Sequence, residues 1–126
     1  MTKGILIPFD NDEPIREVEF NGLQDMYQLI DCQTVDRIGT DKLTFWCDDE
    51  GLFHPEARER MNARAMQLLA YETGNGIGDF GSPMVGNFLI DGPAGLRGEE
   101  TDVPDWVKDF AFTWSTKPPK EDATNG

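Results

Sequence analysis

The sequence predicts one small α+β domain, in which two to three helices pack on a mainly antiparallel sheet of about five strands. Its length of 126 residues suits a single hydrophobic core and is too short for two. Short segments with strand periodicity alternate with segments whose apolar side chains recur at helical spacing. The predicted order is strand, strand, helix, strand, strand, helix, strand, helix over residues 1–115.

The first third of the chain contains two predicted hairpins with a helix between them. Residues 5–8 are a short apolar run typical of a buried strand, and residues 15–20 alternate imperfectly as its partner. Asn21 is a predicted N-cap for a helix of about ten residues. Residues 34–38 and 42–47 then alternate as two strands, which the turn at Gly39 joins into a second hairpin.

A long amphipathic helix is predicted after the central strand, over residues 55–71. Adjacent acids at 48–50 disfavour further strand pairing, and Gly51 permits a tight reversal. Pro55 is the predicted first helical position, because its missing N–H would have no partner there. The apolar stripe of this helix consists of Met61, Ala65, Leu68 and Leu69. We therefore expect Leu68 and Leu69 to be buried.

In the remainder of the chain, the sequence pattern predicts a strand, a polar loop, a helix and a tail. Residues 84–90 form the last strand, in which Gly86 marks a bulge or a close approach. Pro104 opens the last helix, and acids at its start suit the positive helix end. We interpret its apolar stripe, which includes Val107 and Phe110, as core packing; the alternative is an aromatic interaction helix. Residues 116–126 predict a disordered tail.

Charge is the strongest signal in the composition. The chain has 24 Asp and Glu against 11 Lys and Arg, for a formal net charge of −13. This balance argues against direct binding of nucleic acid or of an anionic membrane, because both require basic side chains. Solubility is one explanation of the acids. The other is a surface that imitates a nucleic-acid backbone or complements a basic protein.

The acids occur in three groups along the chain. The first lies at residues 10–19, the second at 48–50 and the third at 99–109. The third group is the candidate partner-binding surface, because exposed carboxylates steer association with a basic partner and an aromatic side chain among them offers an anchor. Its members are Glu99, Glu100, Asp102, Asp105, Trp106 and Asp109.

Catalytic, metal and cofactor motifs are weak in this sequence. Gly76, Gly78 and Gly81 match the spacing of a dinucleotide loop, yet a helix precedes them and a strand follows, which inverts the required order. A Cys47–His54 dyad lacks a group to orient the base. The acids at 48–50 lack the ligand spacing of a calcium loop, so a solvated turn is the better interpretation. We therefore expect that the protein is not an enzyme and that it binds neither a metal ion nor a cofactor.

The two cysteines and the N-terminus indicate a reducing compartment. Cys32 and Cys47 are too few for a disulfide framework and lack zinc-site spacing, so we interpret them as reduced packing residues. The first residues lead straight into a strand without a signal-like segment, and no apolar run approaches the roughly 20 residues of a membrane helix. We expect a cytoplasmic protein.

Several short motifs resemble a family of small proteins carried by bacteriophages and conjugative elements. They are ILIP at 5–8, DDEGLF at 48–53, Asn62 followed by Ala63 and Ala65, and VGNFLIDG at 85–92. The resemblance extends over residues 4–92, and the family is known only as a domain of unknown function. It implies an accessory gene of a mobile element and hence a protein that acts on host machinery. It implies no substrate and no catalytic residue.

Two functional hypotheses follow. The leading one is a non-enzymatic, phage-encoded protein that binds and modulates a basic host protein through its acidic surface, for example a nucleic-acid-binding enzyme. The alternative is a protein that sequesters a small ligand or signalling nucleotide, or a minor enzyme, with its site at the loop of residues 74–81. A nucleotide there requires nearby cations, and the basic side chains available for this are Arg58, Arg60, Arg64 and Arg97.

Overall fold

The computed structural model describes residues 1–74 and 83–115, with side chains described as far as Phe110. It has a five-stranded sheet in the order β2-β1-β5-β4-β3, in which every neighbouring pair is antiparallel. The strands are β1 (Thr2–Ile7), β2 (Arg16–Phe20), β3 (Val35–Gly39), β4 (Thr44–Asp48) and β5 (Phe88–Asp91). The last strand of the sequence therefore lies in the centre of the sheet, between the two hairpins, and the predicted α+β class is confirmed.

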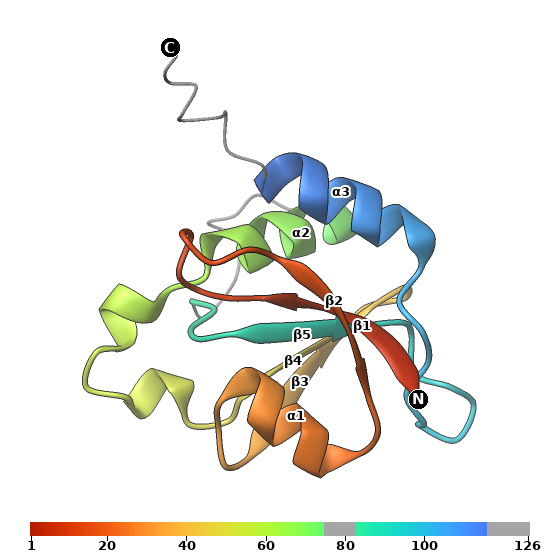
Figure 1. The fold of residues 1–126 in the computed structure, drawn as a ribbon, viewed down its shortest axis with the longest axis horizontal. Coiled ribbons are helices and arrows are strands. Elements are labelled where there is room, and N and C mark those ends of the chain that lie inside the picture. The colour runs from red at the N-terminus through yellow and green to blue at the C-terminus, as the bar shows by residue number, and fades with distance from the viewer. Residues whose placement is uncertain (75–82, 116–126) are drawn as a thin grey trace.

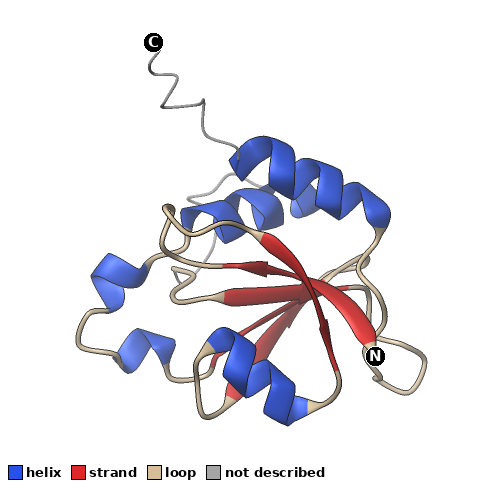
Figure 2. Ribbon diagram, viewed as in Figure 1, coloured by secondary structure: helices blue, strands red, loops and turns tan. Residues whose placement is uncertain are grey.

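Helices cover both faces of the sheet (Figures 1 and 2). Helix α1 (Leu23–Ile30) lies on one face, and helices α2 (Ala63–Thr73) and α3 (Asp105–Ser115) lie beside each other on the opposite face (Figure 1). The predicted order of strands and helices is confirmed. The start of the last helix just after Pro104 is also confirmed.

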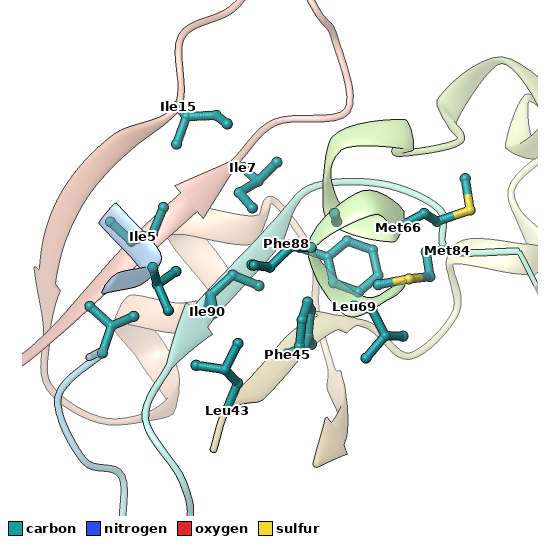
Figure 3. Close-up of a cluster of buried hydrophobic side chains, with 14 residues drawn as sticks. Ile5, Ile7, Ile15, Leu43, Phe45, Met66, Leu69, Met84, Phe88 and Ile90 are labelled. Atoms are coloured by element: carbon teal, nitrogen blue, oxygen red, sulfur yellow. The ribbon is translucent and has the colours of Figure 1, made fainter. Parts of the chain in front are cut away.

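The alternation of side chains along the strands produces two hydrophobic layers. On the face of α2 and α3, strand side chains such as Phe45, Phe88 and Ile90 form one buried cluster with Leu69 and other side chains (Figure 3). On the other face, neighbouring strand residues pack against α1; these include Leu6, Val18, Phe20, Trp46 and Leu89. The expected burial of Leu68 and Leu69 is confirmed, with 1% and 5% of each residue exposed. Val107 of α3 is fully buried, which agrees with core packing of that helix.

The helix predicted to begin at Pro55 begins at Ala63 instead. Two short 3-10 turns lie between β4 and α2: η1 (Gly51–Phe53) precedes Pro55, and η2 (Ala57–Arg60) occupies part of the predicted helix. Met61 then forms an isolated antiparallel bridge with Val85, so this part of the chain is extended rather than helical. The prediction relied on Pro55, whose preference for a helix start is local, whereas long-range pairing fixes this segment.

Asn62 is the N-cap of α2 and is fully buried. Its Oδ1 accepts a hydrogen bond from the Ala65 N–H at 3.0 Å. Its Nδ2 donates to the carbonyl oxygens of Ile7 at 2.8 Å and Gly86 at 2.9 Å. One side chain thus joins the end of β1, the segment before β5 and the start of α2.

Two smaller predictions also differ from the structure. The N-cap of α1 is Gly22, with φ of 85°, rather than Asn21. Asn21 instead donates its backbone N–H to the Asp25 carboxylate at 2.7 Å. The predicted strand at 84–90 is interrupted at Gly86, whose φ is also 85°, and β5 begins only at Phe88. The glycine loop around Gly76–Gly81 and the tail at 116–126 lie outside the described residues.

Candidate functional site

A pocket of about 290 Å³ lies at the β3 edge of the sheet. Strands β3 and β4, turn η1 and the chain leading into β5 form its walls. Much of the lining is apolar and comes from Ile38, Leu52, Met84, Val85 and Phe88. The charged groups among its described lining residues are all carboxylates, namely Asp36, Asp48 and Asp49. The pocket therefore combines an apolar lining with negative charge.

Strand register and the following turn position the three carboxylates. Asp36 on β3 lies directly opposite Cys47 on β4, which also lines the pocket. Asp48 ends β4, where its Oδ1 accepts the Glu50 N–H at 2.9 Å and so fixes the turn. Asp49 extends the hairpin by donating its N–H to the Thr34 carbonyl at 3.1 Å. Pairing of β3 with β4 and the turn after β4 therefore hold the three acids beside the pocket.

Gly51 allows turn η1 to lie against the chain before β5. The residue is buried, and an added Cβ would lie 3.3 Å from the Val85 carbonyl oxygen. A side chain there would push η1 away from that carbonyl. This close approach brings Leu52 to the pocket beside the core residues Met84 and Phe88.

The thiol of Cys47 is held in its neutral form. Burial raises the pKa of this thiol to about 12, and the negative charges of Asp36, Asp48 and Asp49 add to the effect. A thiolate is the reactive nucleophile, so this environment opposes nucleophilic chemistry. His54 is exposed, and its Nδ1 accepts the Glu56 N–H at 3.0 Å instead of serving Cys47.

The acids predicted to bind a partner lie elsewhere, and those before α3 have contacts within the fold. Glu99 turns back on its own loop, where its Oε1 accepts the Arg97 N–H at 3.0 Å. Asp102 accepts the Lys3 N–H of β1 at 2.9 Å. Glu100 is half-buried, and its negative charge lies near enough to raise the pKa of the Asp91 carboxyl.

The predicted residues on α3 form a second subset. Asp105 and Asp109 are exposed, and Asp105 lies 3.7 Å from the Lys108 ammonium. Trp106 is half-buried against the core, with its ring centroid 5.8 Å from that of Tyr71 on α2. The structure thus separates the predicted surface into a loop part and a helix part, and part of the Trp106 ring is already used in packing.

The two acidic regions adjoin segments at opposite ends of β5, and Figure 1 shows the course of these segments. The pocket adjoins the chain that enters β5, whereas the predicted group follows the end of β5 at Asp91. The interpretation of residues 48–50 as a solvated turn agrees with the exposed turn residues Asp49 and Glu50, but it did not include the pocket that Asp48 and Asp49 line. Asp36 belongs to none of the three acidic groups in the sequence. The sequence indicated only that Asp36 and Ile38, two residues apart, lie on the same face of a strand.

Several basic side chains are bound within the fold. Arg64 donates to three backbone carbonyls of the β1–β2 loop, at 2.8, 3.0 and 2.9 Å, which belong to Pro8, Asp10 and Glu13. Arg60 and Arg37 lie over aromatic rings, at 4.5 Å from the Phe9 centroid and 5.7 Å from that of Trp46. The positive charge of these three arginines is thus directed to carbonyls and rings. Two of the cations that a nucleotide loop would need, Arg60 and Arg64, are already occupied.

Asp91 is a buried carboxyl group at the end of β5, with 1% of the residue exposed. Its Oδ1 accepts a hydrogen bond from the Trp46 indole at 3.2 Å, whereas Oδ2 is buried without a partner among the described residues. Burial raises the pKa of this carboxyl to about 7, and the negative charge of Glu100 also raises it. Asp91 therefore changes charge near neutral pH.

Residues 1–74 and 83–115 contain neither a metal-ligand cluster nor a membrane-spanning helix. Within these ranges, no cluster of three or more His, Cys, Asp or Glu side chains is arranged to hold a metal ion. Within them also, no helix has the length and apolar character needed to cross a membrane.

The antiparallel sheet, the helices on both of its faces and the acidic pocket define a small acidic α+β protein. The chain belongs to the family described as Domain of unknown function (DUF3846), whose model matches residues 1–114. Membership of a domain of unknown function is thereby confirmed, and the match extends beyond the motifs at 4–92 into α3. No curated protein and no solved structure matches the chain.

Proposed function

We propose that this protein is a non-enzymatic interaction protein that binds a basic surface of another protein and modulates its activity. The observation that carries this proposal is that several arginine side chains bind groups within the fold and do not offset the excess of carboxylates. Arg64, Arg60 and Arg37 are engaged with carbonyls and aromatic rings, while the chain keeps a net charge of −13. The carboxylates at both ends of β5 mainly accept backbone N–H groups, which leaves their negative charge available to a basic partner.

A nucleic-acid-binding protein of a host cell is the partner that this charge fits best. Such proteins hold phosphates with Lys and Arg, so an acidic surface competes directly with nucleic acid for those side chains. The proposal includes an origin in a bacteriophage or conjugative element and action in the host cytoplasm. It rests on the motif resemblance for the origin and on charge complementarity for the partner.

Affinity capture from a host lysate tests the proposal. The tagged protein is expected to retain a basic protein at low salt and to lose it at high salt, because exposed charges are screened over about 8–10 Å near physiological ionic strength. Mass spectrometry of the protein and small-molecule fractions identifies what is retained. Capture of a metabolite without a protein contradicts the proposal and favours the small-ligand alternative.

Charge-neutral variants then locate the interaction. Changing Glu99, Glu100, Asp102, Asp105 and Asp109 to the corresponding amides is expected to slow association and weaken its salt dependence while the fold is retained. The matched contrast is Trp106→Ala. If binding falls in that variant and is indifferent to the five neutral substitutions and to salt, the interaction is an aromatic anchor and the charge-based proposal is wrong.

A further inference from the structure

We infer that the pocket at the β3 edge binds one cationic side chain, an arginine or lysine, of an extended segment of the partner. The aliphatic part of that side chain lies on the apolar lining, and its charged end reaches the carboxylates of Asp36, Asp48 and Asp49. This inference rests on the proposed function, since it specifies which part of a basic protein is recognised. It assigns a role to Asp48 and Asp49, which the sequence alone predicts as part of a solvated turn, and to Asp36, which lies outside the three acidic groups.

The size of the pocket matches a single side chain. Its volume of about 290 Å³ lies at the lower limit of the roughly 300–1,000 Å³ that is usual for small-molecule sites. A nucleotide also brings phosphates, which the three carboxylates repel. The protonated Cys47 thiol adds no positive charge to offset this repulsion. A single positively charged side chain therefore fits the charge of the pocket and is small enough for its volume.

The division of the lining matches the two parts of an arginine or lysine side chain. Met84, Val85 and Phe88 are buried core residues that present apolar surface to the pocket. Methylene stems of Lys and Arg lie along such surface while the charged group stays in a polar environment. Hydrogen bonds between a cation and a carboxylate are shorter and stronger than neutral ones, and arginine can form two in parallel. An apolar side chain would leave the carboxylates unused.

The surroundings of the pocket favour an extended segment with apolar neighbours. Leu52 lines the pocket and is 51% exposed, and the next residue, Phe53, is 85% exposed. In the described part of the chain, β3 pairs with β4 on one side and is the edge of the sheet on the other. Sheet edges accept extended peptides through their backbone groups. A basic residue flanked by apolar ones is therefore the motif that the site fits.

Binding of a set of matched peptides tests the inference directly. The probe is a nine-residue peptide with one central arginine between two leucines, and its counterparts carry lysine, citrulline or glutamate at the centre. Citrulline keeps the shape of arginine and removes its charge. We expect the arginine and lysine peptides to shift amide NMR signals of Ile38, Cys47 and Val85, and the citrulline peptide to bind at least ten-fold more weakly. Equal binding of arginine and citrulline peptides overturns the inference.

Isosteric variants separate the pocket from the general charge. The triple change Asp36→Asn, Asp48→Asn and Asp49→Asn keeps side-chain shape, and an amide oxygen at 48 can still accept the Glu50 N–H. It is expected to weaken arginine-peptide binding at least ten-fold. The control removes the same charge at the opposite edge of the sheet, on β2 and the loop before it, with Glu13→Gln, Glu17→Gln and Glu19→Gln at exposed positions, and is expected to change affinity less than two-fold. Equal losses in both triple variants contradict a specific pocket.

Two further measurements keep the result interpretable. Thermal unfolding and the NMR spectrum of each triple variant show whether the fold is retained, and Leu52→Ala provides a variant that leaves every carboxylate in place. Leu52→Ala is expected to weaken peptide binding about two- to ten-fold through lost apolar contact. Unchanged affinity for both the pocket triple variant and Leu52→Ala overturns the inference.

The proposed function and the pocket fail in different ways. A captured basic protein that binds the pocket triple variant as tightly as the wild type leaves the proposed function intact and overturns the pocket assignment. Arginine-peptide binding that depends on Asp36, Asp48 and Asp49, without any basic protein captured at low salt, supports the pocket and contradicts the proposed function.

Discussion

The side chain of Asn62 holds together three segments that are far apart in the sequence. It makes three buried hydrogen bonds, to Ile7, Gly86 and Ala65. Each is a bond to a backbone group that has little access to water, so losing the side chain leaves those groups unsatisfied. The residues involved come from the short motifs that resemble the family, which gives those motifs a structural explanation.

We predict that Asn62→Ala lowers the free energy of unfolding by about 2–5 kcal/mol, because a buried donor or acceptor without a partner costs about 1–3 kcal/mol. Urea denaturation measures the change. Asn21→Ala is the matched control, since Asn21 is exposed and contributes its backbone N–H to the bond with Asp25. The control is expected to change stability by less than about 0.5 kcal/mol. Equal effects of the two substitutions would show that Asn62 does not have this role.

Asp91 makes stability depend on pH. The pKa of its carboxyl is about 7 in the folded protein, chiefly because of burial, against an ordinary value of about 4 in the unfolded chain. Between these values the folded protein keeps a proton that the unfolded chain releases, so this group favours the fold at low pH. Its contribution is fully present below about pH 4 and is lost as pH rises through about 7.

Asp91→Asn removes this titration and keeps an oxygen that can accept the Trp46 indole N–H. Relative to the wild type, the variant is expected to gain about 2 kcal/mol in the free energy of unfolding between pH 5 and pH 8. Urea denaturation across this range provides the measurement. Asp109→Asn, at an exposed position, serves as the control and should show no such trend. A difference between Asp91→Asn and the wild type that is constant with pH contradicts the prediction.

Helix α2 stabilises the fold mainly through its buried face. Leu68 is 1% exposed, and we predict that Leu68→Ala lowers the free energy of unfolding by about 2–5 kcal/mol, as a core truncation that leaves a cavity. Leu96→Ala is the matched control, because Leu96 lies fully exposed in the loop after β5. Chemical denaturation of both variants tests this. A loss below about 0.5 kcal/mol at Leu68 would mean that this face is not part of the core.

At the scale of elements, the sequence predicted identity and order better than boundaries. Local patterns located the strands and α3, because apolar runs, alternating or helical spacing and the helix-opening Pro104 are all local properties. Helix α2 begins at Ala63 rather than at the predicted Pro55. The Met61–Val85 bridge and the Asn62 hydrogen bonds fix this segment, and they connect residues far apart in sequence. No local pattern around Pro55 contains that information.

The pocket could be predicted only in part, for the same reason. The acids at 48–50 stand out in the sequence, but their partners in the pocket come from β3 and from the chain before β5. Asp36 appears as one exposed acid on an edge strand until strand register places it opposite Cys47. A site assembled by pairing between distant segments has no signature in any one of them. The group at 99–109 is the reverse case, since it is prominent in the sequence and divided in the structure.

At the scale of the whole molecule, the net charge of −13 opposes compactness. Like charges repel more in the folded protein than in an expanded chain, and salt screens this repulsion. We predict that raising sodium chloride from 10 to 300 mM increases the free energy of unfolding, on the order of 1 kcal/mol. Urea denaturation at each salt concentration tests this. The five-fold neutral variant at 99–109 is expected to respond less, and a fall in stability with salt contradicts the prediction.

The environment of the two cysteines has a practical consequence for labelling. The pKa of the thiol is raised to about 12 at Cys47 and about 11 at Cys32, in both cases chiefly by burial and then by nearby carboxylates. Maleimides and iodoacetamides react with the thiolate, whose fraction at pH 7 falls about ten-fold for each unit of pKa. A cysteine introduced at an exposed position, as in Leu96→Cys, should therefore take up a fluorophore while both native thiols remain unmodified, so dyes and spin labels can be attached to the otherwise native chain.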